Sequence, residues 1–218
     1  MPATQPQGSR DNILHRVRTA LGRSAGQAPS EPPPVRLRIP EVDLEARIAC
    51  MRMRIEALAG TTHRVTTQGE ACALVSGIVA GRPTVASNSP YLAQCGIASI
   101  PGVRTGIRDV DEMRAVAAAS DVGITSADYA LADTGTLVMI SSAAEARLVS
   151  LLPILHVAVV PVDRILTGLD ELFTLLPRPA DRSSSMVLIT GPSRTADIEQ
   201  ILVRGVHGPG QITVIIVG

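Results

Sequence analysis

The chain has 218 residues, a formal net charge of zero, three aromatic side chains and no Lys. Its length allows one well-packed α/β domain with a terminal extension, and its balanced charge and scarce aromatic side chains argue against nucleic-acid binding. Because all 20 basic side chains are Arg, Schiff-base catalysis and a Walker-type phosphate lysine are excluded on this chain.

The first 40 residues are predicted to lie outside the main domain. Apolar residues recur at helical spacing over 11–21, which predicts a short amphipathic helix that either docks on a partner or packs on its own domain. The Pro-rich stretch over 23–40 predicts an extended linker. We therefore expect a helical extension over 1–40 and an α/β domain over 41–218.

Helices and strands are predicted to alternate through the rest of the chain. The apolar spacing and capping residues predict helices over 44–58, 70–79, 109–120, 144–152 and 169–176, and a helical turn over 126–132. Short β-branched runs predict strands over 63–67, 83–87, 122–125, 136–140, 155–160, 165–166, 186–189 and 212–217. This alternation predicts a three-layer α/β/α sandwich with a mainly parallel or mixed sheet.

The C-terminal part is predicted to form a strand–helix–strand unit. The run over 186–189 predicts a buried strand, after which Ser193 or Thr195 would cap a helix that Gly205 ends. A second loop would lead into a buried strand over 212–217.

The predicted helix start is suited to an anion. Free backbone N–H groups, two hydroxyls and the Arg194 guanidinium can converge on a phosphate or carboxylate, whereas the alternative is ordinary helix capping with a solvated Arg. The expected ligand-binding residues at this loop and the next are Gly191, Pro192, Ser193, Arg194, Thr195, Asp197 and Gly208.

A second candidate site is the turn that begins at Asp133. Its carboxylate stands beside Thr134, Gly135 and Thr136, so it suits a base, a nucleophile or a ligand contact, although Asp-Thr-Gly also forms an ordinary Asx-turn. His207, between glycines, is the other candidate acid–base group. We expect the Asp133 turn and the Gly191 loop to face one pocket.

The cysteines Cys50, Cys72 and Cys95 are widely spaced and form no Cys-x-x-Cys pair. We expect free thiols in a reducing compartment, no metal site, and no iron–sulfur cluster on this chain alone. Because no signal segment or membrane-length apolar stretch is visible, we expect a cytoplasmic protein.

Several segments in this order resemble the LUD-domain family, in particular its C-type members of lactate utilisation. The similar segments are 123–138, 147–153, 190–199 and 205–209, with a further likeness over 13–23. The resemblance implies a fold like that of sugar-phosphate isomerases and CoA-transferases. It also implies a role in bacterial oxidation of L-lactate to pyruvate, beside two iron–sulfur partner proteins.

Three functions follow as hypotheses. The chain is an accessory component that binds a small anion or an anionic cofactor of unknown identity at the Gly191 loop. Alternatively, it is a free-standing enzyme of the CoA-transferase or phosphosugar type that uses Asp133 or His207, or it is a non-catalytic scaffold.

Overall fold

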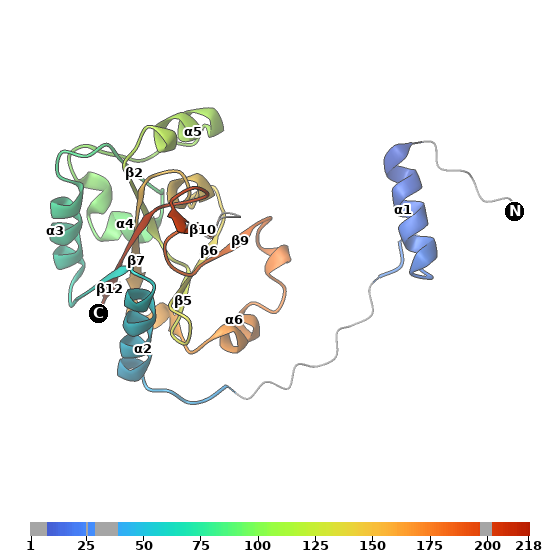
Figure 1. Cartoon of the computed structure of the whole chain (residues 1–218), viewed down its shortest axis with the longest axis horizontal. Helices are drawn as coiled ribbons and strands as arrows, with labels where there is room; N and C mark the ends of the chain where they lie inside the picture. The colour runs from blue at the N-terminus through green and yellow to red at the C-terminus, as the bar shows by residue number, and fades with distance from the viewer. Residues whose placement is uncertain (1–7, 25, 29–38, 197–201) are drawn as a thin grey trace, which may run out of the picture. The chain divides into compact units, whose positions relative to one another are not determined.

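The computed structural model describes residues 8–24, 26–28, 39–196 and 202–218, which fall into two compact units, Met1–Leu37 and Arg38–Gly218 (Figure 1). In the first unit, α1 (Ser9–Ala20) begins two residues before and ends one residue before the predicted helix over 11–21. Its apolar side chains Ile13 and Val17 are exposed, so the described residues of this unit leave the stripe uncovered.

The second unit is built on a six-stranded sheet in which every described pair of neighbours is parallel. Its strands, in spatial order, are β1 (Thr61–Val65), β12 (Gln211–Val217), β7 (Leu155–Pro161), β4 (Val122–Ser126), β2 (Thr84–Ala86) and β3 (Val103–Arg104). The central strands are apolar on both faces, because both faces are covered.

One face of this sheet is covered by α3 (Gln68–Val79), α4 (Pro90–Gln94) and η1 (Ile97–Ser99), as Figure 1 shows. The start of α3 is fixed by a capping box, in which the Thr67 side chain accepts from the Glu70 backbone and Glu70 accepts from the Thr67 backbone. Along β7, Val157 and Val159 point to this face, whereas Ala158 and Val160 belong to the core on the other.

The other face is covered by α2 (Leu44–Ala57), α5 (Val110–Ala118) and a second, four-stranded sheet. That sheet has the order β8 (Ile165–Leu166), β5 (Tyr129–Leu131), β6 (Thr136–Ile140) and β9 (Met186–Ile189), and α6 (Leu169–Leu175) packs on its outer side. Three further 3₁₀ turns are η2 (Arg147–Ser150), η3 (Val162–Arg164) and η4 (Pro179–Asp181). The prediction of a mostly parallel sheet with helices on both sides is confirmed, but the second sheet was not predicted.

Three local predictions are wrong. The predicted helical turn over 126–132 is absent: Ser126 ends β4, and Tyr129–Leu131 form β5, because β6 and β8 pair with it. The predicted helix over 144–152 is reduced to η2, since the Ser142 hydroxyl accepts from the Ala144 and Glu145 backbones and holds a turn there. The strand over 186–189 is a half-exposed edge strand, not a buried one.

The predicted strand–helix–strand unit at the C-terminus is also wrong. A hairpin of β10 (Arg194–Ala196) and β11 (Leu202–Arg204) stands where the helix was expected, and β9 and β12 belong to different sheets. The hairpin base is closed by two backbone hydrogen bonds, Gly205 N to Ser193 O and Ser193 N to Pro209 O. The expected helix cap and its free N–H groups are therefore not formed.

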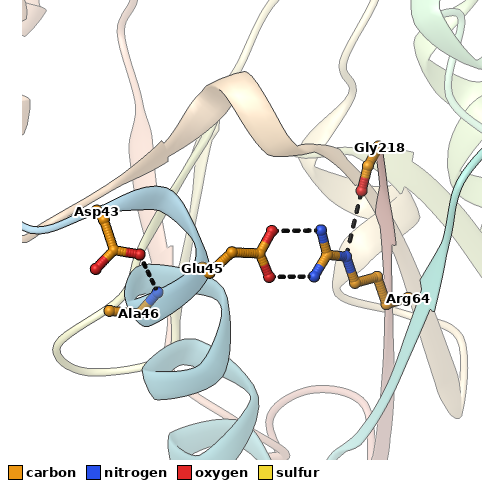
Figure 2. Close-up of polar contacts among 5 residues, drawn as sticks. All are labelled: Asp43, Glu45, Ala46, Arg64 and Gly218. Atoms are coloured by element: carbon orange, nitrogen blue, oxygen red, sulfur yellow. Dashed lines mark hydrogen bonds and ion pairs between the residues drawn. The ribbon is translucent and has the colours of Figure 1, made fainter.

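A surface ion pair fixes α2 to the sheet edge. In Figure 2 the Arg64 guanidinium of β1 donates hydrogen bonds from both terminal nitrogens to the Glu45 carboxylate, with lengths of 2.5 and 2.7 Å. Its Nε donates to the Gly218 carbonyl at 3.3 Å. The Asp43 carboxylate caps α2 by accepting from Ala46 N at 3.0 Å. Hydrogen bonding to Arg64 lowers the pKa of Glu45.

Candidate functional site

The Asp133 turn and the Gly191 loop lie side by side, because β6 and β9 are antiparallel neighbours that place Leu137 opposite Ile189. A chain of hydroxyls joins them. Thr136 Oγ1 lies 2.7 Å from Thr190 Oγ1 and 2.8 Å from Thr134 Oγ1, and Thr134 Oγ1 donates to the Asp133 carboxylate at 3.2 Å. The register of the second sheet thus brings the two predicted segments together.

Two glycines in these segments make room for α2. Gly135 and Gly191 have φ values of 69° and 86°, which favour glycine. A Cβ at Gly135 would lie 2.8 Å from Arg54 Cβ, and one at Gly191 would lie 3.1 Å from Leu58 Cβ. The sequence suggested that these glycines let a ligand approach, whereas the structure fills the space beside them with the end of α2.

A hollow of about 390 Å³ opens beside the Gly191 loop and is called the Gly191 hollow below. It is lined by Arg147, Ser150, Leu151, Val187, Leu188, Ile189, Thr190, Gly191, Ser193, Gly208 and Pro209. The lining is mainly apolar, and Arg147 is the cationic side chain among these residues. A hollow of this kind suits a ligand with an apolar body and one anionic group.

The structure separates the residues predicted for this loop. Gly191, Ser193 and Gly208 line the hollow, but Arg194 is exposed and donates to the Leu58 carbonyl at the end of α2. Pro192 is buried within the loop. The Thr195 backbone pairs with Val203 in the hairpin, and Asp197 lies outside the described residues.

The two predicted catalytic residues, Asp133 and His207, are exposed. Neither is among the described residues that line the Gly191 hollow. The lining cation, Arg147, was missed because its segment was assigned to a helix with no chemical role.

A second hollow of about 270 Å³ lies at the carboxyl ends of the parallel strands and is called the switch-point hollow below. It is lined by Ser89, Pro90, Tyr91, Gln94, Ser126, Asp128, Ser142, Ala144, Glu145 and Arg164. From β2 the chain moves outward to β3 and then returns to β4 on the other side. Ligands of open α/β sheets bind at such a reversal of strand order.

The carboxyl groups in the switch-point hollow are held away from water. Burial raises the pKa of Glu145 to about 7, against the opposing effect of nearby Ser87 and the Ser126 backbone. Burial also raises the pKa of Asp128, whose carboxylate accepts from Ile140 N at 2.7 Å. Near neutral pH, Glu145 therefore exists in both its neutral and its charged form.

Sequence reasoning missed this hollow. Its one local signal was the polar residues that directly follow two buried strands, Ser87–Ser89 after β2 and Ser126–Asp128 at the end of β4. Glu145 and Arg164 come from distant segments, and only the tertiary fold brings them here.

The described residues include no group of three or more His, Cys, Asp or Glu side chains that could hold a metal ion. Cys50, Cys72 and Cys95 are all free thiols. Among the helices that the structure describes, none is long and apolar enough to cross a membrane.

Comparison with solved structures relates the fold to a DUF162 family protein from Deinococcus radiodurans. The TM-score is 0.63 at 19% identity, and the match covers 82% of this chain and all of that one. At this identity the likeness establishes the fold alone.

Curated relatives match parts of the chain. Lactate utilization protein C from Halalkalibacterium halodurans is 41% identical over 102 residues, which cover 45% of this chain and 44% of the relative. The protein of the same name from Geobacillus kaustophilus is 29% identical over 181 residues, covering 73% and 74%. In the first of these relatives, as in that from Macrococcus caseolyticus, the match spans about half of the relative's length.

A family model, described as the LUD domain, matches residues 49–217. This range includes both sheets and every residue that lines the two hollows. The chain therefore belongs to the LUD-domain family.

Proposed function

We propose that this chain is an accessory component of bacterial L-lactate utilisation, in which lactate is oxidised to pyruvate together with iron–sulfur partner proteins. The observation that carries the proposal is the LUD-domain match over 49–217, combined with relatives named lactate utilization protein C. Binding of a small anionic ligand is the part of this role that we assign to the chain itself.

Electron transfer is assigned to the partner proteins. Iron–sulfur clusters are usually held by four convergent Cys thiolates. Here Cys50 lies in α2 on one face of the parallel sheet, whereas Cys72 and Cys95 lie on the other face. We therefore expect protein purified without air to contain no stoichiometric iron or sulfide, and a full cluster found by chemical assay would contradict this part of the proposal.

The ligand is proposed to bind in the Gly191 hollow with its anionic group on Arg147. Among the residues that the structure describes, Arg147 Nη1 makes one long contact, 3.5 Å, to the Ser185 hydroxyl, so its guanidinium retains donors for a phosphate or carboxylate. Ser193 lines the same hollow and adds a hydroxyl donor. The Ser150 hydroxyl already donates to the Arg147 carbonyl at 3.0 Å, and the Thr190 hydroxyl is hydrogen-bonded to Thr136 at 2.7 Å. The apolar side chains of β9 would face the uncharged body of the ligand, which favours a cofactor-like anion over an inorganic ion.

A thermal-shift screen with CoA esters, flavin nucleotides and sugar phosphates tests this proposal, because a specific ligand stabilises the folded state by mass action. Arg147→Gln should weaken the binding of a hit by roughly 1.5–3 kcal/mol, the scale of a hydrogen bond to a charged group. Arg194→Gln is the matched variant, since Arg194 lies in the same region but donates to Leu58. Equal affinity of the wild type and Arg147→Gln for every hit would contradict the assignment.

A further inference from the structure

The switch-point hollow contains buried polar atoms that the protein leaves without partners. Glu145 and Ser126 are only 8% and 2% exposed. Among the described residues, neither Glu145 Oε2 nor Ser126 Oγ has a hydrogen-bond partner, and both side chains line the hollow. The Ser87 hydroxyl near Glu145 is unpartnered too, but Ser87 does not line the hollow. Since a buried polar group without a partner is costly, these atoms are expected to bind something that enters the hollow.

The same hollow contains a cation, Arg164, together with the carboxyl groups of Asp128 and Glu145. Arg164 is half-buried at the end of η3, and its guanidinium carbon lies 5.9 Å from the centre of the Tyr91 ring. Its guanidinium donates a long hydrogen bond, 3.4 Å, to the Ala127 carbonyl, and no described carboxylate lies within ion-pair distance of Arg164. Arg164 is therefore free to bind an anionic group.

The size of the hollow limits the ligand. At about 270 Å³ it is smaller than the roughly 300–1,000 Å³ typical of sites for drug-sized molecules. Its polar lining differs from the apolar lining of the Gly191 hollow, so the two hollows suit different molecules. This volume and polar lining suit a few-carbon metabolite.

We propose that the switch-point hollow is a second binding site, which takes a small carboxylic acid with a hydroxyl or carbonyl oxygen next to its carboxylate. The carboxylate binds Arg164, and the second oxygen binds Ser126 and Glu145. A hydroxyl ligand can donate to the unpartnered Glu145 Oε2, and a carbonyl ligand can accept from the Ser126 hydroxyl. The assignment does not depend on the anion proposed for the Gly191 hollow.

The test is isothermal titration calorimetry of the full chain with L-lactate and pyruvate as probes of this class. Propionate lacks the second oxygen and lactamide lacks the charge, so each should bind at least about tenfold more weakly than the better probe. Arg164→Gln should weaken that probe by about tenfold or more, in line with the loss of a charge-assisted hydrogen bond. Arg164→Lys, which keeps the charge, should recover part of the affinity.

Arg147→Gln is the matched control, because it removes a guanidinium from the Gly191 hollow only. The proposal expects this variant to bind the probe within about twofold of the wild type, and Ser126→Ala to lose affinity for L-lactate and pyruvate but not for propionate. The proposal is overturned if neither probe binds the wild type. It is equally overturned if Arg164→Gln, folded by circular dichroism, keeps full affinity, or if Arg147→Gln loses as much as Arg164→Gln.

Discussion

Replacing Glu145 by Gln should make the stability of the protein change differently with pH. Burial raises the pKa of this carboxyl group from its ordinary 4.5 to about 7 in the folded state. The folded protein then binds a proton that the unfolded chain has already released, so the stabilising effect is complete below pH 4.5 and is lost as the pH rises through about 7. The Glu145→Gln variant has no titrating group at this position, so it does not lose stability in this way.

The magnitude follows from the size of the shift. One pKa unit corresponds to about 1.4 kcal/mol, so a shift from 4.5 to about 7 corresponds to about 3 kcal/mol in total. A minor part of this stabilisation is already lost at pH 5. Between pH 5 and pH 8, the free energy of unfolding of Glu145→Gln should therefore rise relative to that of the wild type by about 2–3 kcal/mol.

Urea denaturation at pH 5 and at pH 8 measures this difference. Glu41→Gln is the control, since it removes a carboxyl group from an exposed position instead of the interior. A difference between Glu145→Gln and the wild type that stays constant from pH 5 to pH 8, or that changes in the opposite direction, would refute the reasoning.

Three further predictions concern other parts of the chain. His156 is buried and lies 2.8 Å from Thr125 Oγ1, and burial lowers the pKa of this His to about 4, so its contribution to stability is present above pH 6.5 and is lost as the pH falls through about 4. His156→Gln should therefore flatten the acid side of the stability curve, and a curve parallel to that of the wild type between pH 6.5 and pH 4 would argue against this. The Arg64 hydrogen bond lowers the pKa of Glu45, so the pair should stabilise above pH 4.5 and lose its effect as the pH falls further. Glu45→Gln should lower the melting temperature at pH 7 in low salt but hardly at all in 1 M NaCl, because salt screens a surface pair; equal losses in both buffers would be inconsistent with an ionic contribution. Deleting residues 1–30 should leave the melting temperature of the LUD domain unchanged while reducing co-purification with iron–sulfur partners, whereas loss of cooperative unfolding would place the apolar stripe of α1 in the domain core.

The central strands could be predicted from the sequence, because the apolar composition of these segments indicates that they are buried. The runs over 155–160 and 212–217 are mostly apolar and rich in β-branched residues, as is typical of a parallel strand covered on both faces. Capping residues were equally informative at α5, where Asp109 accepts from the Glu112 backbone as expected. Both signals act within a few residues, so a single sequence contains them.

The second sheet and the hairpin were not predictable in this way, because their stability comes from pairing between distant segments. Tyr129–Leu131 is a strand because β6 and β8 lie beside it, and Arg194–Ala196 is a strand because β11 folds back on it. The error at the hairpin had a direct consequence for the site. A helix start would have directed Arg194 at a ligand, whereas the hairpin directs it to the Leu58 carbonyl and leaves Arg147 as the cation of the Gly191 hollow.

The most direct test of the proposed role is growth of the host bacterium on L-lactate after deletion of the gene for this chain. The deletion strain should fail to grow on L-lactate as its carbon source, should grow normally on pyruvate, the product of the oxidation, and should recover when the gene is restored. Normal growth of the deletion strain on L-lactate, with no second copy of such a gene in the host, would contradict the proposal that this LUD-domain protein acts in lactate utilisation.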